Sequence, residues 1–455
     1  MEMAGVPASA GDGLAFTGPE VALPSSFKVT AGAQALVGAF SAAVGHLATI
    51  RSPDNQPPGT RRIEVDSLET CIAFQSERHL RLGDAPKLWD ELSGHYATVD
   101  GFIQFHTNFV HHRDALLKAT GCGSSDDRSA VEAVVATAGR FELEQVVIDA
   151  GGIAAALRSM DEWNQHPHAA HIDGRPPLVS GRSGTSTGQP LPAAEPGRPL
   201  SGVKVLDMTR VIAGPVCSKA LAAYGADVIR IGAPDLPVVD SILPDTTLGK
   251  RFAHCDITTT EGRETLLELV AEADVVVTGF RPGALAGYEL DDEDLFEANP
   301  TLVIGSLNAF GSDGPWGDRR GFDSITQTAT GIVASETEAF DSPKPRPLPC
   351  QFLDHGTGYL LALGVVGALA RRHDGPAAQT IDASLLTTRN WLASFGRDHT
   401  GAGEQPDDET VARFLETRPS PFGELRHVGQ PGRIEGTVPA WDRGPSKPGA
   451  DQPRW

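Results

Sequence analysis

A regular alternation of strand-like and helix-like segments after residue 200 constrains this fold more than any other feature of the sequence. Residues 203–208 form an apolar run, residues 213–224 have helical periodicity, and residues 227–231 form a second apolar run. The pattern continues with a helix over 261–272, a strand over 274–278, a helix over 291–298 and a strand over 302–307. Strands that alternate with helices in this way predict an α/β fold with a parallel, doubly wound sheet.

The turns that follow three of these strands are candidates for a ligand site. In such a sheet, ligands bind beyond the carboxyl ends of the strands, so we expect the turns at 209–215, 279–283 and 308–314 to line one crevice. None of them has GxGxxG spacing, and the chain contains no GxxxxGK[ST] motif. The sequence therefore disfavours dinucleotide cofactors and P-loop nucleotides.

A polar segment turns into a long apolar one at residues 351–372, QFLDHGTGYLLALGVVGALARR. The run that follows Asp354 has hardly a polar interruption, which predicts a helix buried on all sides. We expect Asp354 to cap this helix, where unpaired N–H groups and the helix dipole would keep its carboxylate ionised. Gly356 and Gly358 would let a bulky ligand approach that carboxylate. A purely structural cap is the alternative.

The N-terminal part of the chain echoes this region. The matching segments are 27–40 with 352–365 and 61–74 with 379–395. Thr30 occupies the position that answers Asp354. We interpret residues 1–87 as a partial repeat of the closing helices of the large domain, and a chance likeness of two buried helices is the alternative.

Composition divides the rest of the chain. One region is richer in His, Trp and Phe and mixes strand and helix patterns, and a later stretch is rich in Pro, Gly and Ser without periodicity. The predicted organisation is a partial repeat (1–87), a second, smaller α+β domain (88–172), a linker (173–200), a large Rossmann-like domain (201–396) and a C-terminal return segment (397–455).

Charge and cysteine content limit the ligand class and the compartment. The chain has 38 basic and 59 acidic residues and a net charge of −21, which argues against nonspecific binding to nucleic acid or membranes. Five scattered cysteines without CxxC spacing predict reduced thiols in a cytoplasmic protein. The N-terminus lacks the pattern of a signal peptide, and the longest apolar run, 358–370, is shorter than a membrane span. The histidines between 106 and 112 match no standard metal site, so we expect no metal.

Three motifs in the second half of the chain, taken in order, resemble the family III CoA-transferases. That group includes formyl-CoA and carnitine CoA-transferases and α-methylacyl-CoA racemases. The motifs are LSGVKVLDMTRVIAGPVCSKALAAYGADVIRI (200–231), GKRFAHCDITTTEGRETLLELVAEADVVVTGFRPGAL (249–285) and NPTLVIGSLNAFGSDGPWGDRRGFDSITQTATG (299–331). The region 88–172 resembles the family's small domain, but here it precedes the large domain instead of following it.

The resemblance implies roles for the residues that match the family's active site. Asp354 matches the aspartate that attacks the acyl-CoA thioester to give a mixed anhydride, and Asp323 matches a second acidic position close to it. Phe322 stands where the racemases have a proton-exchanging histidine, which disfavours racemase activity. Backbone amides of the first turn would lie near the thioester and stabilise its oxyanion: Val211, Ile212, Ala213 and Gly214.

The resemblance also implies coenzyme A as the acyl carrier. Arg320 matches a basic position used toward CoA, and Lys250 and Arg251 match a typical Lys-Arg pair of the family. Three other basic positions of the formyl-CoA enzyme are Ala233, Thr258 and Gly287 here. We therefore expect phosphate binding to be weaker or to move to other basic residues: Arg210, Arg230, Lys250 or Arg281.

The predicted function is transfer of CoA between an acyl-CoA and a carboxylic acid through an aspartyl anhydride and thioester. One alternative is an acyl-CoA racemase or isomerase that uses Asp323 and Asp354. A second is a non-catalytic CoA-binding subunit, suggested by the altered domain order and the missing phosphate contacts. Family members resemble interlocked rings of two chains, so we expect a homodimer, with an internal mimic of one as the alternative.

Overall fold

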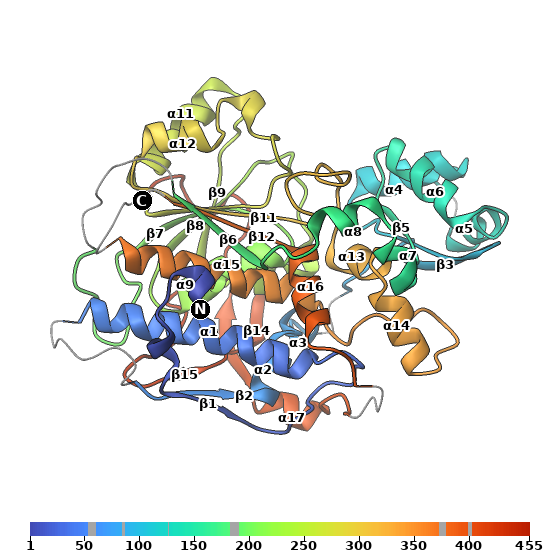
Figure 1. The fold of residues 1–455 in the computed structure, drawn as a ribbon. Helices are drawn as coiled ribbons and strands as arrows, with labels where there is room; N and C mark the ends of the chain where they lie inside the picture. The colour runs from blue at the N-terminus through green and yellow to red at the C-terminus, as the bar shows by residue number, and fades with distance from the viewer. Residues whose placement is uncertain (53–60, 84–86, 126, 183–190, 373–378, 399–402) are drawn as a thin grey trace.

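The computed structural model describes residues 1–455 apart from 53–60, 84–86, 126, 183–190, 373–378 and 399–402 (Figure 1). The protein is a mixed α/β structure built on one large, mostly parallel sheet, with smaller sheets beside it. In its described residues the large sheet has seven strands in the order β6-β12-β11-β10-β7-β8-β9. These are β6 (Leu178–Arg182), β7 (Lys204–Met208), β8 (Asp227–Gly232), β9 (Lys250–His254), β10 (Val275–Thr278), β11 (Val303–Asn308) and β12 (Gln379–Ser384).

The strand order of this sheet reverses next to β7. The chain runs outward from β7 through β8 to β9, and then returns to the other side of β7 with β10, β11 and β12. Six of these described strands are parallel, and β6 is antiparallel to β12 at one edge. A reversal of this kind opens a crevice at the carboxyl ends of the strands that flank it.

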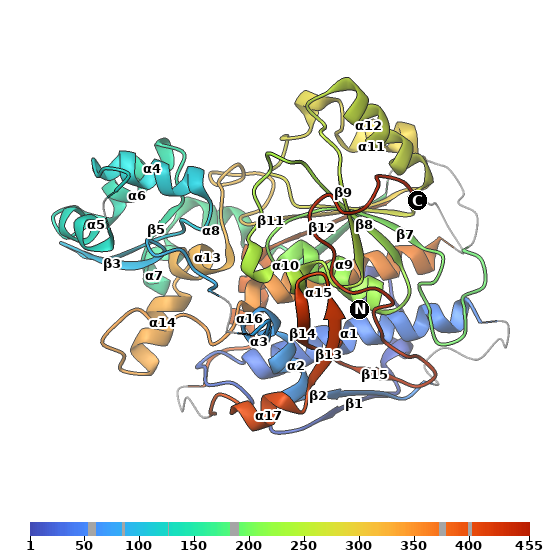
Figure 2. The same cartoon turned by 180° about the vertical axis from the view of Figure 1, so that it is seen from behind.

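Helices cover both faces of the large sheet (Figures 1 and 2). One face carries α9 (Ala213–Ala223) and α15 (Phe352–Arg371), and the other carries α11 (Thr260–Glu272) and α12 (Asp292–Ala298). Neighbouring residues on one strand therefore enter different cores: Val205 packs with α9 and α15, whereas Leu206 packs with α11 and α12. Because β7, β8, β10 and β11 lie between these two helix layers, they are mostly apolar, and their predicted bounds agree with the observed ones to within one residue.

The predicted linker contains structure. Residues 178–182 form β6, which pairs with the otherwise open edge of β12. The segment LVSGR has only two apolar residues and also contains a glycine. Its local pattern therefore did not identify it as a strand. Its pairing depends on β12, which lies about 200 residues later in the chain.

Helix α15 is buried along nearly its whole length, as predicted. It packs between α9 and α1 (Val29–Ile50). The glycines near its start serve this packing, not the approach of a ligand: a Cβ atom at Gly358 would lie 2.5 Å from the Ala213 carbonyl oxygen, and one at Gly356 would lie 3.0 Å from the Thr388 methyl carbon. The expected role of these glycines was therefore wrong.

Gly358→Ala should destabilise the protein, because the new methyl group would overlap a backbone oxygen of α9 that can move only with its helix. We expect a loss of about 1–3 kcal/mol in the free energy of unfolding. Gly45→Ala in α1 is the control, since its Cβ atom would meet Ile434 at an ordinary 3.5 Å and alanine favours a helix. Denaturant unfolding of both variants tests this, and equal stability of the two would contradict the packing described.

The N-terminal region has the same element order as the region around α15. Helix α1 is followed by β2 (Ile63–Asp66) and α2 (Ser67–Ala73), just as α15 is followed by β12 and α16 (Leu385–Ser394). However, β2 lies in a small sheet of its own, between β1 (Leu14–Thr17) and β15 (Arg433–Ile434). The shared order supports the interpretation as a partial repeat, and common origin stays a prediction.

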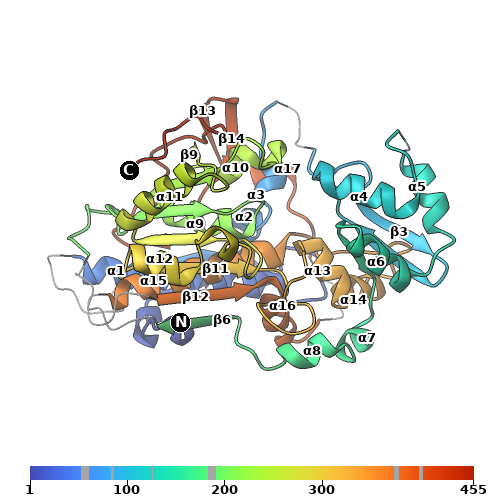
Figure 3. The ribbon, with the colours of Figure 1, turned by 90° about the horizontal axis from the view of Figure 1, so that it is seen from above.

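A smaller unit projects from the side of the large sheet (Figure 3). Its antiparallel sheet consists of β3 (Gly94–Thr98), β4 (Gly101–Phe105) and β5 (Ala154–Ala156). Helices α4 (Val110–Thr120), α5 (Arg128–Val135) and α6 (Arg140–Asp149) pack on it around a separate core. The remaining elements are α3 (Ser76–His79), α7 (Met160–Asn164), α8 (Pro167–Ile172), α10 (Leu243–Thr246), α13 (Asp323–Ala329), α14 (Ile332–Ala339), α17 (Asp408–Ala412), β13 (Leu415–Ser420) and β14 (Gly423–Val428), with short 3-10 turns at Glu2–Ala4, Ala8–Gly11, Asp240–Ile242 and Ala286–Tyr288.

Two described helices, α1 and α15, are long and apolar enough to cross a membrane by length and composition. They run to 22 and 20 residues, so the expectation that no apolar segment reaches this length was wrong. In the fold, 67% and 100% of their most apolar windows are buried inside the protein. Burial of this kind is typical of core helices.

Candidate active site

The reversal in strand order opens into a cavity, which we call the main cavity. All three turns predicted to share one crevice contribute to it: Arg210–Ala213 after β7, Gly279–Pro282 after β10 and Asn308–Ala309 after β11. This prediction is confirmed. The topology of the sheet alone brings these segments together, although they are widely separated in the chain.

Asp354 lies at the wall of the main cavity. It is the third residue of α15, not its cap: Gln351 occupies the cap position, and no side chain caps the helix there. Its side chain is 7% exposed and lines both the main cavity and a second, smaller one. The predicted capping role is therefore wrong, but the carboxyl group does face a cavity at the start of the helix.

Asp323 lies directly behind Asp354. It is the first residue of α13 and is fully buried. Its Oδ2 accepts a hydrogen bond from the backbone N–H of Asp354 at 2.9 Å, and its Oδ1 accepts one from the Gln327 amide. Asp323 thus supplies the carboxylate that accepts a hydrogen bond from the first turn of α15. The sequence had assigned this capping role to Asp354.

The charge state of Asp354 differs from the prediction. Burial, followed by the charges of Asp323 and Glu77, holds the pKa of Asp354 well above its ordinary value. Burial also raises the pKa of Asp323, to about 6, against the hydrogen bonds that it accepts. Two buried carboxyl groups this close cannot both ionise easily. Asp354 therefore favours its protonated form instead of being held ionised.

The turn that faces Asp354 has an unusual backbone. Val211 has a φ of 68°, a conformation that β-branched residues rarely adopt and that tends to occur at functional sites. Val211 and Ile212 line both cavities, and Ala213 lines the main one. Gly214 packs against Thr209, where a Cβ atom would lie 2.4 Å away, so its role here is close packing within the turn.

Lys250 and Arg251 lie away from the main cavity. The Lys250 side chain is fully buried and donates from Nζ to Asp207 Oδ2 at 2.8 Å and to Ser218 Oγ at 2.7 Å. Arg251 pairs with Asp227 at 2.7 Å and donates to the Arg454 carbonyl. The expectation that this pair contacts CoA is not met, because Lys250 has no surface left for a ligand. Lys250 instead joins β7 to α9, the strand and the helix on either side of the turn at Val211.

Four arginines give the main cavity a basic wall: Arg210, Arg281, Arg319 and Arg320. Arg320 donates to the Gly151 carbonyl at 3.2 Å, while Arg319 was not predicted and is bound by Glu144 at 2.8 Å. Arg230 is buried over the ring of Phe252 and does not line this cavity. The sequence showed that basic residues cluster here, but not which of them face the cavity.

The smaller unit supplies part of the wall of both cavities. Phe109, His111 and His112 line the main cavity, and His106 stacks on Phe322 with ring centroids 3.8 Å apart. Sequence reasoning considered these histidines only as metal ligands. Among the described residues, no group of three or more His, Cys, Asp or Glu side chains is arranged to hold a metal ion. The sequence did offer one indication that these histidines lie near the site, because they follow directly after the strand β4.

The second cavity adjoins the main one at Asp354. Both are lined by Val211, Ile212, Phe322 and Asp354. The N-terminal region and the smaller unit together supply most of its remaining wall: Glu77, Arg78, Leu88, Trp89, His106 and Asn108. Asp354 therefore lies where a basic space and a smaller space with aromatic walls meet.

The site combines a buried pair of carboxyl groups, a strained turn and a basic cavity at a sheet reversal, and comparison with known proteins shows which family this region resembles. The sequence model of the family described as CoA-transferase family III matches residues 200–415. This span contains Asp323, Asp354 and the turn at Val211. This part of the chain, just under half of its length, is similar to that family. Residues before 200, including the smaller unit, lie outside the match.

The similar proteins are themselves named as CoA-transferases. A protein of Mycobacterium tuberculosis named "Probable fatty acyl-CoA transferase Rv3272" is 32% identical over 43% of this chain and 52% of its own length. The formyl-CoA:oxalate CoA-transferase of Rhodopseudomonas palustris (strain TIE-1) is 35% identical over 54% of this chain and 61% of its own. A crystal structure of a CAIB/BAIF family protein from Brucella suis has 30% identity and a TM-score of 0.40, over 46% of this chain and 60% of that one. The chain thus spans about half to three fifths of these relatives.

Proposed function

We propose that this protein is an enzyme that transfers CoA between an acyl-CoA and a free carboxylic acid, with Asp354 as the nucleophile. One observation carries the proposal: the family's aspartate lies at the junction of two cavities, facing the strained turn at Val211. A nucleophile that exchanges groups between two substrates needs access to both. The family match supports the same activity.

The proposed chemistry proceeds without an added oxidant or reductant. A carboxylate oxygen of Asp354 attacks the thioester carbon, the C–S bond breaks, and CoA thiolate leaves a mixed anhydride behind. The thiolate then attacks the aspartyl carbonyl and releases the donor acid as a carboxylate. The acceptor carboxylate attacks the aspartyl thioester, and the freed thiolate attacks the new acyl carbon, which regenerates Asp354.

The surrounding residues have supporting roles in this proposal. Backbone amides of the turn at Val211, Ile212 and Ala213 stabilise the oxyanion, and Arg281 and Arg320 bind the phosphates of CoA in the main cavity. Asp323 orients the first turn of α15 through its bond to the Asp354 N–H. The acyl group lies in the second cavity. We further propose that the large sheet is a doubly wound one, which helices on both faces support.

A transfer assay across a panel of acyl-CoA donors and carboxylate acceptors tests the function. We expect acceptor-dependent formation of a new acyl-CoA. In deuterated water, a chiral 2-methylacyl-CoA should keep its α-proton, because Phe322 has no exchangeable proton. Wash-in of deuterium at a catalytic rate would favour the racemase alternative, and CoA binding without turnover would favour a non-catalytic subunit.

Assembly as a cytoplasmic homodimer stays a prediction. Light scattering should give twice the mass of the 47.9 kDa chain at micromolar concentration. A monomer that retains full transfer activity would contradict the homodimer. It would instead support the internal mimic, in which residues such as Glu77, Trp89 and His106 complete the site from within the same chain.

A further inference from the structure

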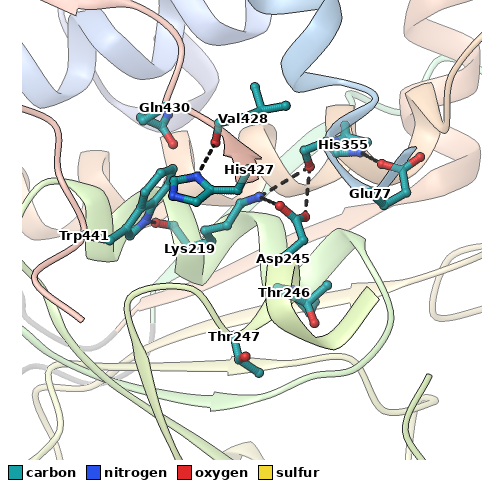
Figure 4. A network of polar contacts seen from close by, with 12 residues as sticks. Glu77, Lys219, Asp245, Thr246, Thr247, His355, His427, Val428, Gln430 and Trp441 are labelled. Atoms are coloured by element: carbon teal, nitrogen blue, oxygen red, sulfur yellow. Dashed lines mark hydrogen bonds and ion pairs between the residues drawn. The ribbon is translucent and has the colours of Figure 1, made fainter. Parts of the chain in front are cut away.

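A short helix of the N-terminal region contacts the residue next to the proposed nucleophile. Helix α3 places Glu77 against His355, and Glu77 Oε2 lies 3.0 Å from His355 Nε2 (Figure 4). Glu77 is 2% exposed and His355 is 1% exposed. Since Glu77 and Asp354 both line the second cavity, this buried pair lies immediately beside the reacting carboxyl group.

Glu77 keeps its charge in this position. Burial alone would raise the pKa of Glu77, but its hydrogen bond and electrostatic interaction with His355, together with Arg78, lower it below the ordinary value. Its Oε1 makes no hydrogen bond and lies 3.4 Å from Arg78 Nε. An ionised carboxylate therefore lines the same cavity as Asp354 and raises the pKa of Asp354.

Other charged groups lie around this pair, and most of them compensate one another. Lys219 and Asp245 form a buried ion pair at 2.8 Å (Figure 4). The Ser76 hydroxyl on α3 donates to Asp245 at 2.9 Å and so joins the ion pair to that helix. The titratable and charged groups around the Glu77–His355 pair and Asp354 are Arg78 and His79 on α3, Lys219 on α9, Asp245 on α10, Asp323 on α13, Cys350 before α15 and His106 after β4. Asp323 and Glu77 act on Asp354 as nearby negative charges and raise its pKa.

We propose that Glu77 is a positioning residue for Asp354, which holds the first turn of α15 through His355 and sets the basicity of the nucleophile through its own negative charge. The inference rests on the proposed function. A more basic carboxylate is a better nucleophile, but a smaller fraction of it is ionised at low pH. Because α3 lies outside residues 200–415, a part of the chain beyond the family match controls the family's nucleophile.

Glu77→Gln separates charge from shape. Glutamine keeps the size and can still bond to His355, but it removes the negative charge that opposes ionisation of Asp354. We expect the acidic limb of the kcat–pH profile to move to lower pH. At or below the pH of the wild-type midpoint, the variant should therefore retain a larger fraction of its own plateau activity than the wild type does. Well below that pH the difference should be about threefold. The plateau should fall, because the carboxylate is less basic.

Two further variants distinguish this role from general support of the fold. Glu77→Ala also removes the contact with His355, so its plateau should fall below that of Glu77→Gln. Glu336→Gln is the matched control: Glu336 is fully buried and binds the N-terminal region through Ser25 and Ser26, but it lines neither cavity. Its pH profile should match the wild type. Superimposable profiles for Glu77→Gln and wild type, with both proteins folded, would overturn the inference.

A chemical readout keeps this test independent of transfer activity. A water-soluble carbodiimide reacts with protonated carboxyl groups, so peptide mass spectrometry across a pH series follows the protonation of Asp354. Labelling of Asp354 should stop at a lower pH in Glu77→Gln than in the wild type. If the wild type transfers no CoA but this shift occurs, the proposed function fails and the electrostatic control stands. If transfer occurs without any shift, the function stands and the inference fails.

Discussion

Asp354→Asn is expected to reduce CoA transfer by several orders of magnitude while the protein still folds. Asparagine keeps the shape of the side chain but cannot form the anhydride or the thioester that the proposed mechanism requires. After mixing with acyl-CoA, peptide mass spectrometry should find a mass increase on the Asp354 peptide of the wild type and none in the variant. Asp292→Asn, in the exposed first turn of α12, is the control and should retain both transfer and the adduct.

The same variant should be more stable than the wild type at neutral pH. The folded-state pKa of Asp354 is raised above its unfolded value, so ionisation opposes folding, and stability is lost as the pH rises above the unfolded pKa. Asparagine removes that cost, for a gain on the order of 1 kcal/mol or more. The gain should shrink near pH 3, where Asp354 is protonated in both states. Wild-type transfer by the variant would refute the mechanism and make Asp323 the next candidate.

Lys250→Met should be among the most destabilising single substitutions, with a loss of about 3–5 kcal/mol in the free energy of unfolding. The Lys250 and Asp207 side chains are both fully buried, and methionine would leave the Asp207 carboxylate without its nearest counter-charge. Asp207 Oδ1 also accepts from the Thr209 backbone N–H and hydroxyl, so the loss should extend to the turn at Val211. Thermal and denaturant unfolding measure the effect.

A surface ion pair gives the matched control for this substitution. Lys204 pairs with Glu272 at 2.6 Å, but both side chains are partly or largely exposed, so Lys204→Met should change stability by less than about 1 kcal/mol. Adding Asp207→Asn to Lys250→Met should recover part of the loss, because the buried charge is then gone. If Lys250→Met unfolds like the wild type, Lys250 does not stabilise the turn and a surface role must be reconsidered.

The large sheet and its crevice could be predicted from the sequence because they depend on local patterns. Apolar runs of strand length and a helix period between them suffice to place a parallel sheet, and the topology then brings the turns together. Asp354 could be located for the same reason: it lies at the boundary of one long apolar helix. The family resemblance added the roles of Asp354 and Asp323.

The chemistry around Asp354 depends on contacts that no local pattern shows. Its raised pKa comes from burial and from Asp323 and Glu77, which lie on separate elements. Lys250 matches a family position next to the crevice, yet its side chain turns to Asp207 inside the fold. The walls contributed by His106 and Trp89 come from a region whose own sequence predicted only a small domain. Pairings over such distances are set by tertiary packing and not by periodicity.

The small sheet formed by β1, β2 and β15 has a consequence for how the protein reaches its fold during synthesis. Ile63 pairs with Ile434, so roughly 370 residues must be added after β2 before β15, its second partner strand, exists. At roughly 5–20 residues per second, this takes on the order of 20–70 s. During that time the apolar helix α1 also lacks α15, on which it packs. The nascent chain should therefore depend on chaperones that shield apolar surface until its last segments leave the ribosome.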